Sequence, residues 1–490
     1  MTNDLRFSRA QATAAALGAE DVHRFTDKSV LLTGAEGVLA TANGREMSIA
    51  AVLLLMRTTT SLTVSLPPSQ AGLAAELTAW ATDHMWDVLP TFVDLPVDMT
   101  DFDAILSIGG VPRHGLPMTV IACDGWTVRV SSGLTPVAQD SFDANPIAAL
   151  GAASLGVGEV FKRLLRLHPD AGELVDGCVF SLWSYRMGEE GSAPSLPEVL
   201  DLDVLIAGAG AIGNGVGHLI SRLSVKGRVA VVDAQPYGEE NWGTCLRLKR
   251  AAATAMKAKY LADLLDGPVR ARGYPGRIDA VAERPDWRTP PVVLNGFDNV
   301  EARYAAQDLW PDIVIDGAIG PKLECQVTVH PWDTGTACVR CTFDLPVGPS
   351  AEAVQAQASG LAREALGDLT RVLTEADIAA AAPEKQPWLR ERLGKPICSV
   401  LEEAAALSAD ALSKSFRPSV PFVATFSACM MVTELVRHLV GGSAVLEPKF
   451  FFSLLWGFGR GDFYPEDRHA DCICVRRAKN IAWVRAQRRA

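Results

Sequence analysis

The chain has 490 residues, of which 48% are hydrophobic and 21% charged, values typical of a folded protein with a sizeable core. Its length allows roughly two to four domains. The formal net charge of −11 argues against nucleic acid as a general partner, because phosphate contacts need clustered lysines and arginines. We interpret the basic end, RRAKNIAWVRAQRRA, as a solvated terminus.

Membrane and disulfide signals are weak. The first residues, MTNDLRFSRA, are polar and do not resemble a signal peptide. The most apolar stretch, residues 420–440, contains Glu434, Arg437 and His438, so we expect a buried core helix rather than a membrane span. Ten unevenly spaced cysteines do not suggest a disulfide framework. We therefore expect a cytoplasmic protein with no membrane partner, in which cysteines bind metal or act as nucleophiles.

The first half shows a faint α/β rhythm. Residues 28–37 are predicted as a strand running into a glycine loop, residues 102–110 as a later strand and residues 145–165 as a buried helix. Glu36 stands in the loop where a phosphate would approach, and its charge would repel that phosphate. Residues 1–187 are therefore interpreted as a nucleotide fold that has lost its ligand.

The second half shows the same rhythm clearly after a predicted linker at residues 188–201. Its predicted strands are 203–210, 228–234, 291–299 and 312–320, and its first predicted helices are 211–223 and 251–265. This alternation predicts an α/β fold with two Rossmann-like, doubly wound halves. Two unrelated α/β domains would give a similar pattern, so duplication is not the only interpretation.

A glycine loop follows the first strand of the second half. In G-x-G-x-x-G, Gly208 permits the tight turn, Gly210 lets the backbone approach a phosphate and Gly213 lets helix and strand pack closely. Asp233 ends the next strand and can accept hydrogen bonds from a ribose. These features alone suit NAD, FAD or an adenylate equally well.

Residues further along the chain distinguish these ligands. We find no clear hydride-transfer constellation. Lys257 and Lys259 lie on the helix after Asp233, and Asp298 begins the stretch DNVEAR. A lysine for phosphate and an aspartate for Mg²⁺ suit a nucleoside triphosphate, whose leaving pyrophosphate needs its charge neutralised.

Two cysteine pairs predict a zinc site. Cys338 and Cys341 have the C-x-x-C spacing of a zinc knuckle, and Cys472 and Cys474 form a second pair. Four thiolates this far apart in sequence would join the chain's end to the nucleotide domain in a closed structural site. The second pair is only one residue apart, so His469 is an alternative fourth ligand, and free thiols are the other interpretation.

Cys398 is the candidate nucleophile. Ser399 and Glu402 have capping-box spacing, which predicts that a helix starts there. Cys398 would lie just before that helix, where backbone N–H groups and the helix dipole favour a thiolate, although Glu402 and Glu403 oppose this. Cys429, within an apolar stretch, is interpreted as core.

The order of the motifs resembles the ThiF superfamily of ubiquitin-activating and molybdopterin-synthase-activating enzymes. The resemblance covers most of residues 202–345, through VLIAGAGAIGNG, VVDA, NWGTCLRL, MKAKYLADLL, LNGFDNVEARY, VIDGAIG and CQVTVHPWDTGTACVRC. It implies that ATP is the nucleotide and that residues 202–490 form an active adenylation domain.

The resemblance also implies roles for individual residues. In that family the strand-end aspartate binds ribose, a helix lysine contacts ATP phosphates and the D-N-x-x-x-R aspartate holds Mg²⁺. These roles fall on Asp233, Lys259 and Asp298, with Asn299 and Arg303 in support.

Two departures from the family pattern affect the site. Gln235 stands where the family has the second aspartate of D-x-D. Asn241 is followed by WGTC, where the family has N-x-x-R-Q. Arg247 is the candidate replacement for the missing phosphate-binding arginine, although its spacing differs, and Asn241 stays a cofactor-binding candidate.

The N-terminal stretch LRFSRAQ resembles the family motif R-Y-x-R-Q, which sends an arginine into a neighbouring subunit's ATP site. Arg9 matches that arginine, so it would act either across a homodimer or within a chain that carries both an inactive and an active half. A surface arginine at a helix start is the alternative.

The stretch around Cys398 is similar to the P-x-C-[TS] motif of ubiquitin-activating enzymes, whose cysteine forms a thioester within a crossover segment, here near residues 343–420. The resemblance implies ATP, Mg²⁺ and Zn²⁺ as cofactors, a small β-grasp ubiquitin-like substrate and a conjugating-type carrier. The compact form is similar to activating enzymes of bacterial ubiquitin-like conjugation operons, some of which act in phage defence. The alternatives are a sulfur-carrier or peptide adenylyltransferase without a thioester step, or an inactive nucleotide-binding scaffold.

Overall fold

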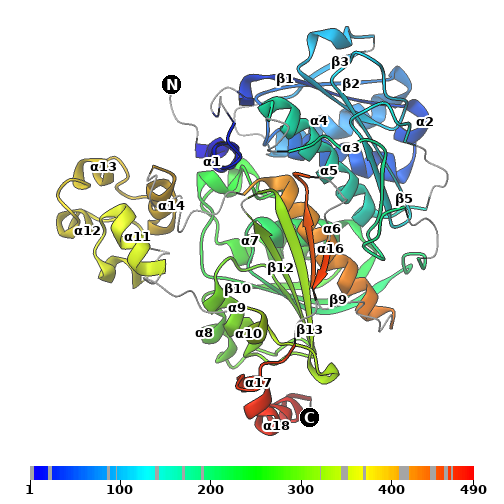
Figure 1. Ribbon diagram of the computed structural model, residues 1–490. Coiled ribbons are helices and arrows are strands. Elements are labelled where there is room, and N and C mark those ends of the chain that lie inside the picture. The colour runs from blue at the N-terminus through cyan, green and yellow to red at the C-terminus, as the bar shows by residue number, and fades with distance from the viewer. Residues whose placement is uncertain are drawn as a thin grey trace.

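The computed structural model contains two β-sheets, one in each half of the chain, and a small helical lobe (Figure 1). It describes residues 5–489 apart from 20–21, 23–24, 85–88, 95, 138–142, 168–171, 189–192, 321, 344–350, 368–370, 408–418, 442–448, 457–461 and 465–466.

The first sheet has seven strands in the order β3-β2-β1-β4-β5-β6-β7. Its strands are β1 (Ser29–Gly34), β2 (Ser61–Leu66), β3 (Thr91–Asp94), β4 (Ala104–Ile108), β5 (Met118–Asp124), β6 (Thr127–Ser131) and β7 (Cys178–Ser181). Strands β1 to β5 pair in parallel with one another, whereas β6 pairs antiparallel with β5 and β7 antiparallel with β6.

The second sheet has eight strands in the order β10-β9-β8-β11-β12-β13-β14-β15. Its strands are β8 (Leu200–Ala207), β9 (Val225–Asp233), β10 (Arg270–Pro275), β11 (Val292–Asn295), β12 (Ile313–Gly320), β13 (Glu324–Pro331), β14 (Lys449–Ser453) and β15 (Asp462–Tyr464). Its first five strands follow the same order as those of the first sheet, and the rest are antiparallel. This repeated order confirms the predicted α/β class with two Rossmann-like halves.

The helices cover the two sheets differently. In the first half they are α1 (Ser8–Ala16), α2 (Glu36–Leu39), α3 (Ala42–Leu55), α4 (Ala71–His84) and α5 (Pro146–Leu165). In the second half they are α6 (Ala211–Arg222), α7 (Lys257–Leu265), α8 (Ile278–Ala282), α9 (Val300–Gln307), α10 (Val339–Thr342), α16 (Pro421–Leu439), α17 (Ile473–Arg476) and α18 (Ala478–Arg489). Helices cover both faces of the second sheet, whereas one face of the first packs mainly against residues of the segment before β4 and of the loop after it, Val97, Met99, Phe102 and Leu116.

One large core joins the halves, because α5 of the first packs against α6 and α16 of the second. Ser154 on α5 and Thr425 on α16 share a hydrogen bond of 2.8 Å within this core. Helix α16 is long and apolar enough to span a membrane, but 89% of its most apolar window is buried inside the protein. The expected buried core helix is therefore confirmed.

The loop after β1 is closed by its own neighbours. A Cβ atom at Gly109, just after β4, would lie only 2.5 Å from the Val38 side chain on α2. Val38 thus packs closely against the chain just after β4, beside the loop that follows β1.

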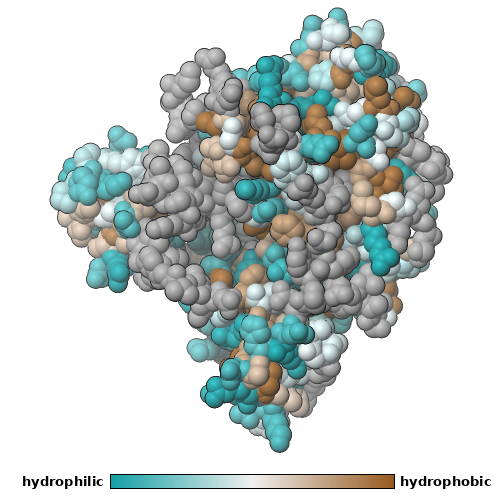
Figure 2. All heavy atoms as spheres, in the orientation of Figure 1, coloured by the Kyte–Doolittle hydropathy of each residue, from teal (hydrophilic) through white to brown (hydrophobic). Residues whose placement is uncertain are grey.

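A lobe of short helices projects from the second half (Figure 1). It contains α11 (Ala351–Ser359), α12 (Glu375–Ala380), α13 (Gln386–Arg390) and α14 (Ile397–Leu407). The lobe has its own small core around Leu373, Ile378 and Leu389, and its visible face is largely hydrophilic (Figure 2).

Candidate nucleotide and metal sites

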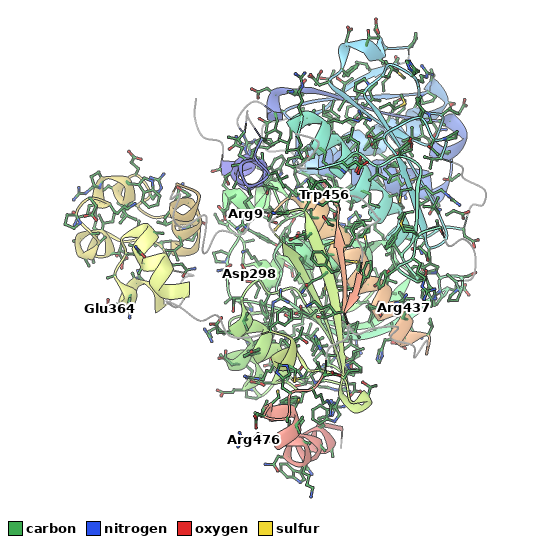
Figure 3. All side chains as sticks on the ribbon, viewed as in Figure 1. Arg9, Asp298, Glu364, Arg437, Trp456 and Arg476 are labelled. Atoms are coloured by element: carbon green, nitrogen blue, oxygen red, sulfur yellow. The ribbon has the colours of Figure 1, made fainter. Side chains whose placement is uncertain are left out.

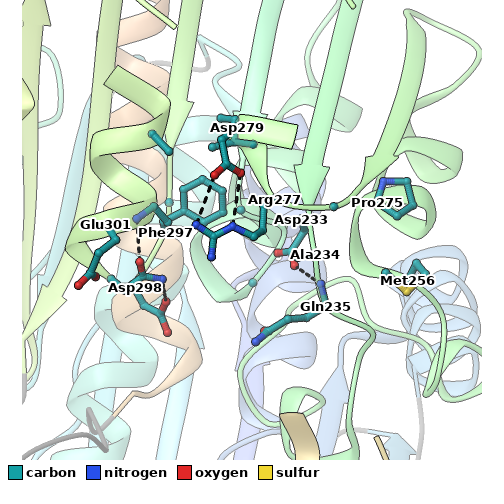
Figure 4. Close-up of a pocket in the computed structure, with 18 of the residues that line it drawn as sticks. Asp233, Ala234, Gln235, Met256, Pro275, Arg277, Asp279, Phe297, Asp298 and Glu301 are labelled. Atoms are coloured by element: carbon teal, nitrogen blue, oxygen red, sulfur yellow. Dashed lines mark hydrogen bonds and ion pairs between the residues drawn. The ribbon is translucent and has the colours of Figure 1, made fainter. Parts of the chain in front are cut away.

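A cavity of about 580 Å³ lies at the carboxyl ends of β8, β9, β10 and β11. Ligands of open α/β sheets bind at this edge, where the strand order reverses. The predicted residues Gly208, Gly210, Asp233, Asp298 and Asn299 all line this cavity. The structure therefore brings the core of the predicted nucleotide site together (Figure 4).

The glycine loop has the backbone that its sequence predicts. Gly208 has φ of +92°, a left-handed conformation that favours glycine. A Cβ atom at Gly213 would lie 2.0 Å from the Gly208 carbonyl oxygen, so helix and turn could not pack with any larger residue. Asn214 holds the loop from below, because its side-chain amide donates to the Ala209 carbonyl oxygen at 2.9 Å. Gly210 faces open space, which leaves room for a ligand.

Asp233 is fixed beneath the loop. Its carboxylate accepts hydrogen bonds of 2.8 Å from the backbone N–H groups of Ala209 and Gln235. Burial raises the pKa of Asp233 above its ordinary value, and the nearby charge of Lys257 opposes that shift. The carboxylate is therefore rigidly placed at the cavity wall.

The two candidate lysines differ in position. Lys257 begins α7, is 5% exposed, and its Nζ donates to the Gln235 side chain at 3.0 Å. Lys259 is exposed. The predicted second helix starts only at Lys257, because residues 250–252 form a 3-10 turn and Met256 is extended and bridges to Pro236. Lys257, rather than Lys259, is thus the lysine near the cavity wall.

Asp298 lies exposed in the cavity, directly after β11. Among the described residues it forms no ion pair, and Asn299 beside it caps α9 by accepting from the Ala302 N–H at 2.8 Å. Arg303 pairs with the buried Asp316 behind the site. A carboxylate without a protein cation is suited to a divalent ion such as Mg²⁺.

The loop that departs from the family pattern serves as a joint between the halves. Asn241 accepts from the Gly238 N–H at 3.0 Å, and so stabilises its own turn. Trp242 is fully buried, and its indole N–H donates to the His84 carbonyl oxygen of the first half at 2.6 Å. A Cβ atom at Gly243 would lie 1.9 Å from the Arg6 carbonyl oxygen, so glycine is required there.

Arg247, the predicted replacement arginine, is not among the described residues that line the cavity. Its guanidinium donates to the Ser221 hydroxyl at 2.9 Å and lies 5.0 Å from the Trp80 ring centre. Its side chain faces the first half because the 241–248 loop packs there.

Arg9 lies on α1 of the same chain. The preceding turn η1 (Leu5–Phe7) packs on η6 (Glu239–Asn241), and the Phe7 ring meets Trp242 edge-on at 6.2 Å. Burial raises the pKa of Cys245 to about 11, and the charge of Arg9 is among the causes that oppose this. Arg9 is thus close to the altered loop (Figure 3), although it is not among the residues that line the cavity.

Sequence reasoning missed several residues of the cavity lining, among them Arg277 and Leu366. Arg277 follows β10 and faces Asp279, with nitrogen–oxygen distances of 3.4 Å. Leu366 of η9 (Arg363–Gly367) reaches the same cavity from the lobe. Arg277 could have been predicted from its position just after a strand, whereas nothing in the sequence around Leu366 indicates that it reaches the cavity.

The four predicted metal ligands form one cluster. The sulfur atoms of Cys338, Cys341, Cys472 and Cys474 lie within 4.8 Å of one another. Three of the sulfur–sulfur distances are 3.7–3.8 Å. A tetrahedron with Zn–S bonds of about 2.3 Å has an edge of roughly 3.8 Å, so the donors fit zinc. His469 instead donates its backbone N–H to Cys341 Sγ at 3.4 Å.

Comparison with known proteins identifies the family. Residues 185–474, more than half of the chain, match the sequence model of the ThiF family. The chain belongs to the ThiF family. Residues 30–179 match the BilD N-terminal domain.

Individual relatives of this ThiF-family chain are distant. A protein of Collimonas sp. (strain OK412), described as bacterial E1-like protein BilD, is 24% identical over 374 residues, which cover 70% of this chain and 71% of that protein. Among solved structures, E. coli MccB with MccA-N7isoASN has a TM-score of 0.33 at 11% identity and covers 56% of this chain and 66% of MccB. E. coli MccB with ATP has a TM-score of 0.31 at 12% identity, with the same coverage of 56% and 66%.

The lobe of this ThiF-family chain carries Cys398 in the first turn of α14. The side chains of Cys398 and Glu402 lie outside the described part of the structure. The predicted capping box is wrong, because the helix starts at Ile397 and the Ser399 hydroxyl packs on Gly238 instead of capping it. Helix α14 thereby contacts η6, which belongs to the second half.

Proposed function

We propose that this chain is an ATP-dependent adenylyltransferase that activates the C-terminal carboxylate of a small β-grasp ubiquitin-like protein. The observation that carries the proposal is the grouping of Asp233, Lys257 and Asp298 around the glycine loop. Membership of the ThiF family and the E1-like description of the Collimonas relative support it. Residues 202–490 would form the active domain and residues 1–187 its inactive counterpart, in a cytoplasmic protein.

In the first step, a carboxylate oxygen of the substrate attacks the α-phosphorus of ATP. The bond from that phosphorus to the bridging oxygen of the β-phosphate breaks, and pyrophosphate leaves with the bonding electrons. Asp233 would hold the ribose, and Lys257 would take the phosphate role first assigned to Lys259. Mg²⁺ held by Asp298 would neutralise charge on the phosphates.

In the second step, the Cys398 thiolate attacks the acyl carbon of the adenylate, and AMP leaves. The thioester is then passed to a conjugating-type carrier. The charge of Glu403, which would oppose the thiolate, is offset by Arg392 at 2.6 Å and Lys395 at 2.7 Å. The contact between Ser399 and Gly238 supports a short path from the nucleotide half to α14.

Two further assignments complete the proposal. The four-cysteine cluster would hold a structural zinc ion. Arg9 would act within its own chain, because α1 and the altered loop it lies near belong to one polypeptide. A homodimer is then not required for an Arg9 contact.

Pyrophosphate exchange tests the first step. With ATP, Mg²⁺ and the ubiquitin-like substrate, the Asp298→Ala protein should exchange about 100-fold more slowly than the wild type, because a transition-state electrostatic contact is lost. Asp308→Ala, at an exposed site paired with Arg340, is the control and should exchange normally. Normal exchange by Asp298→Ala would overturn the Mg²⁺ assignment.

Adduct formation tests the second step. Cys398→Ala should keep pyrophosphate exchange and lose the thiol-sensitive adduct with the substrate, because the thiolate has no part in binding ATP. Exchange without any adduct in the wild type would indicate a peptide or sulfur-carrier adenylyltransferase, and neither activity would indicate a scaffold. Cys245 is a poor substitute nucleophile, because burial raises its pKa to about 11.

A further inference from the structure

The cavity lining carries more negative than positive side chains, so it does not by itself neutralise the charge of a triphosphate. Four carboxylates line it, from Asp233, Asp279, Asp298 and Glu301, and Arg277 is the only basic residue among the described lining residues. Lys257 stands behind the wall and is bonded to Gln235. Arg277 is therefore the cationic side chain of the described lining that an anionic ligand could contact directly.

The turn before Arg277 is joined to the end of β9, next to the cavity. Gly276 donates its N–H to the Asp233 carbonyl oxygen at 3.1 Å and has φ of +141°, a conformation that other residues rarely adopt. This turn ties the start of α8 to the end of β9. In Figure 4 the Arg277 guanidinium lies among Asp279 of α8, Asp233 at the end of β9 and Asp298 in the loop after β11.

Arg277 is held only loosely in place. Both nitrogen–oxygen distances to Asp279 are 3.4 Å, long for a charge-assisted bond, and the Arg277 side chain is 76% exposed. Asp279 also accepts from the Ala280 N–H at 2.9 Å, so its carboxylate stays in position if Arg277 leaves. The guanidinium can thus exchange one anionic partner for another.

We infer that Arg277 binds the triphosphate of ATP, and that Asp279 is the partner which the phosphates replace. The fork of a guanidinium matches two phosphate oxygens, and a single-stemmed ammonium matches them less well. Arg277 would supply the positive charge that Arg247, turned toward Trp80, does not bring to the cavity. The inference rests on the proposed ATP site.

Calorimetric binding of ATP, AMP and adenosine to the full chain, with Mg²⁺ present, tests the inference. Arg277→Ala should weaken ATP binding roughly 10-fold or more, the size expected for a charge-assisted contact, and leave adenosine binding within about 2-fold. Arg277→Lys should recover part of the loss. Asp279→Asn should bind ATP more tightly than the wild type, because it releases the guanidinium.

The control is Arg284→Ala, which removes an arginine that pairs with Asp286 outside the cavity lining. If Arg277→Ala loses ATP and adenosine affinity equally, the contact is to the base, and the inference is overturned. Unchanged ATP affinity in Arg277→Ala also overturns it. If the wild type itself binds no ATP, the proposed function fails instead.

Discussion

The guanidinium of Arg57 donates to the Trp242 carbonyl oxygen at 2.7 Å, although the two residues belong to different halves of the chain. It also reaches the carbonyl oxygens of Cys245 at 3.3 Å and Leu248 at 3.4 Å. Burial lowers the pKa of Arg57 to about 9, so the side chain stays charged at neutral pH. The first half thus fixes the loop that contains Asn241.

Arg57→Met should destabilise the protein strongly. The change leaves the buried carbonyl oxygens of the 242–248 loop without their donor, and each buried acceptor left unsatisfied costs about 1–3 kcal/mol. Denaturant unfolding measures the loss. Arg45→Met, which removes an arginine with 46% exposure and surface ion pairs, should cost below about 1 kcal/mol. Equal effects of the two variants would mean that the joint contributes little.

Lys257→Ala should slow pyrophosphate exchange at least about 10-fold, whereas Lys259→Ala should exchange like the wild type. The reason is position, since Lys257 is buried beside Gln235 and Lys259 is exposed. Circular dichroism of both variants controls for folding. The reverse ranking would restore the assignment to Lys259.

The purified protein should hold about one zinc ion per chain, and Cys338→Ser should lose it and unfold more easily. Elemental analysis and thermal unfolding measure the two effects. Cys178→Ser, at a buried cysteine on β7 outside the cluster, should keep the metal. Metal-free wild-type protein of full stability would count against the site.

The free energy of unfolding should fall as the pH drops below 6.5. Burial is the main cause that lowers the pKa of His84 from 6.5 to about 3, and it lowers that of His218 as well. The unfolded chain therefore binds more protons over this range, and His84 alone costs about 2 kcal/mol at pH 5.

The variant His84→Phe should flatten this pH dependence, measured by urea unfolding between pH 7 and pH 5. His114→Phe, at an exposed histidine, is the control. A profile as steep in His84→Phe as in the wild type would assign the acid sensitivity to other groups.

Local pattern was enough to predict much of the fold and part of the candidate site. Gly208, Asp233 and Asp298 each lie at or shortly after the end of a buried strand, and parallel strands bring such ends together. Lys257 and Lys259 are separated by roughly 200° around a helix, so choosing between them requires knowing which face is buried. The two closely spaced cysteine pairs were sufficient to predict the four-cysteine cluster, because such pairs are typical of metal sites.

Contacts between the two halves could not be predicted from the sequence. Arg57 and Trp242 are 185 residues apart, and nothing near either residue signals the other. From the sequence, the missing family arginine of the 241–248 loop was interpreted as a departure that weakens the nucleotide site. In the structure the same loop gains Trp242 and Gly243 as packing residues against the first half.

The cysteine cluster also acts on the unfolded chain. It joins sulfur atoms that are 133 and 134 positions apart, and the stretch between them contains the whole lobe and α16. A metal ion there would close a loop of that length, which by chain-entropy reasoning removes about 5 kcal/mol of conformational freedom from the denatured ensemble. The lobe that carries Cys398 lies inside that loop, so a bound metal would limit how far the unfolded lobe can move from the nucleotide half.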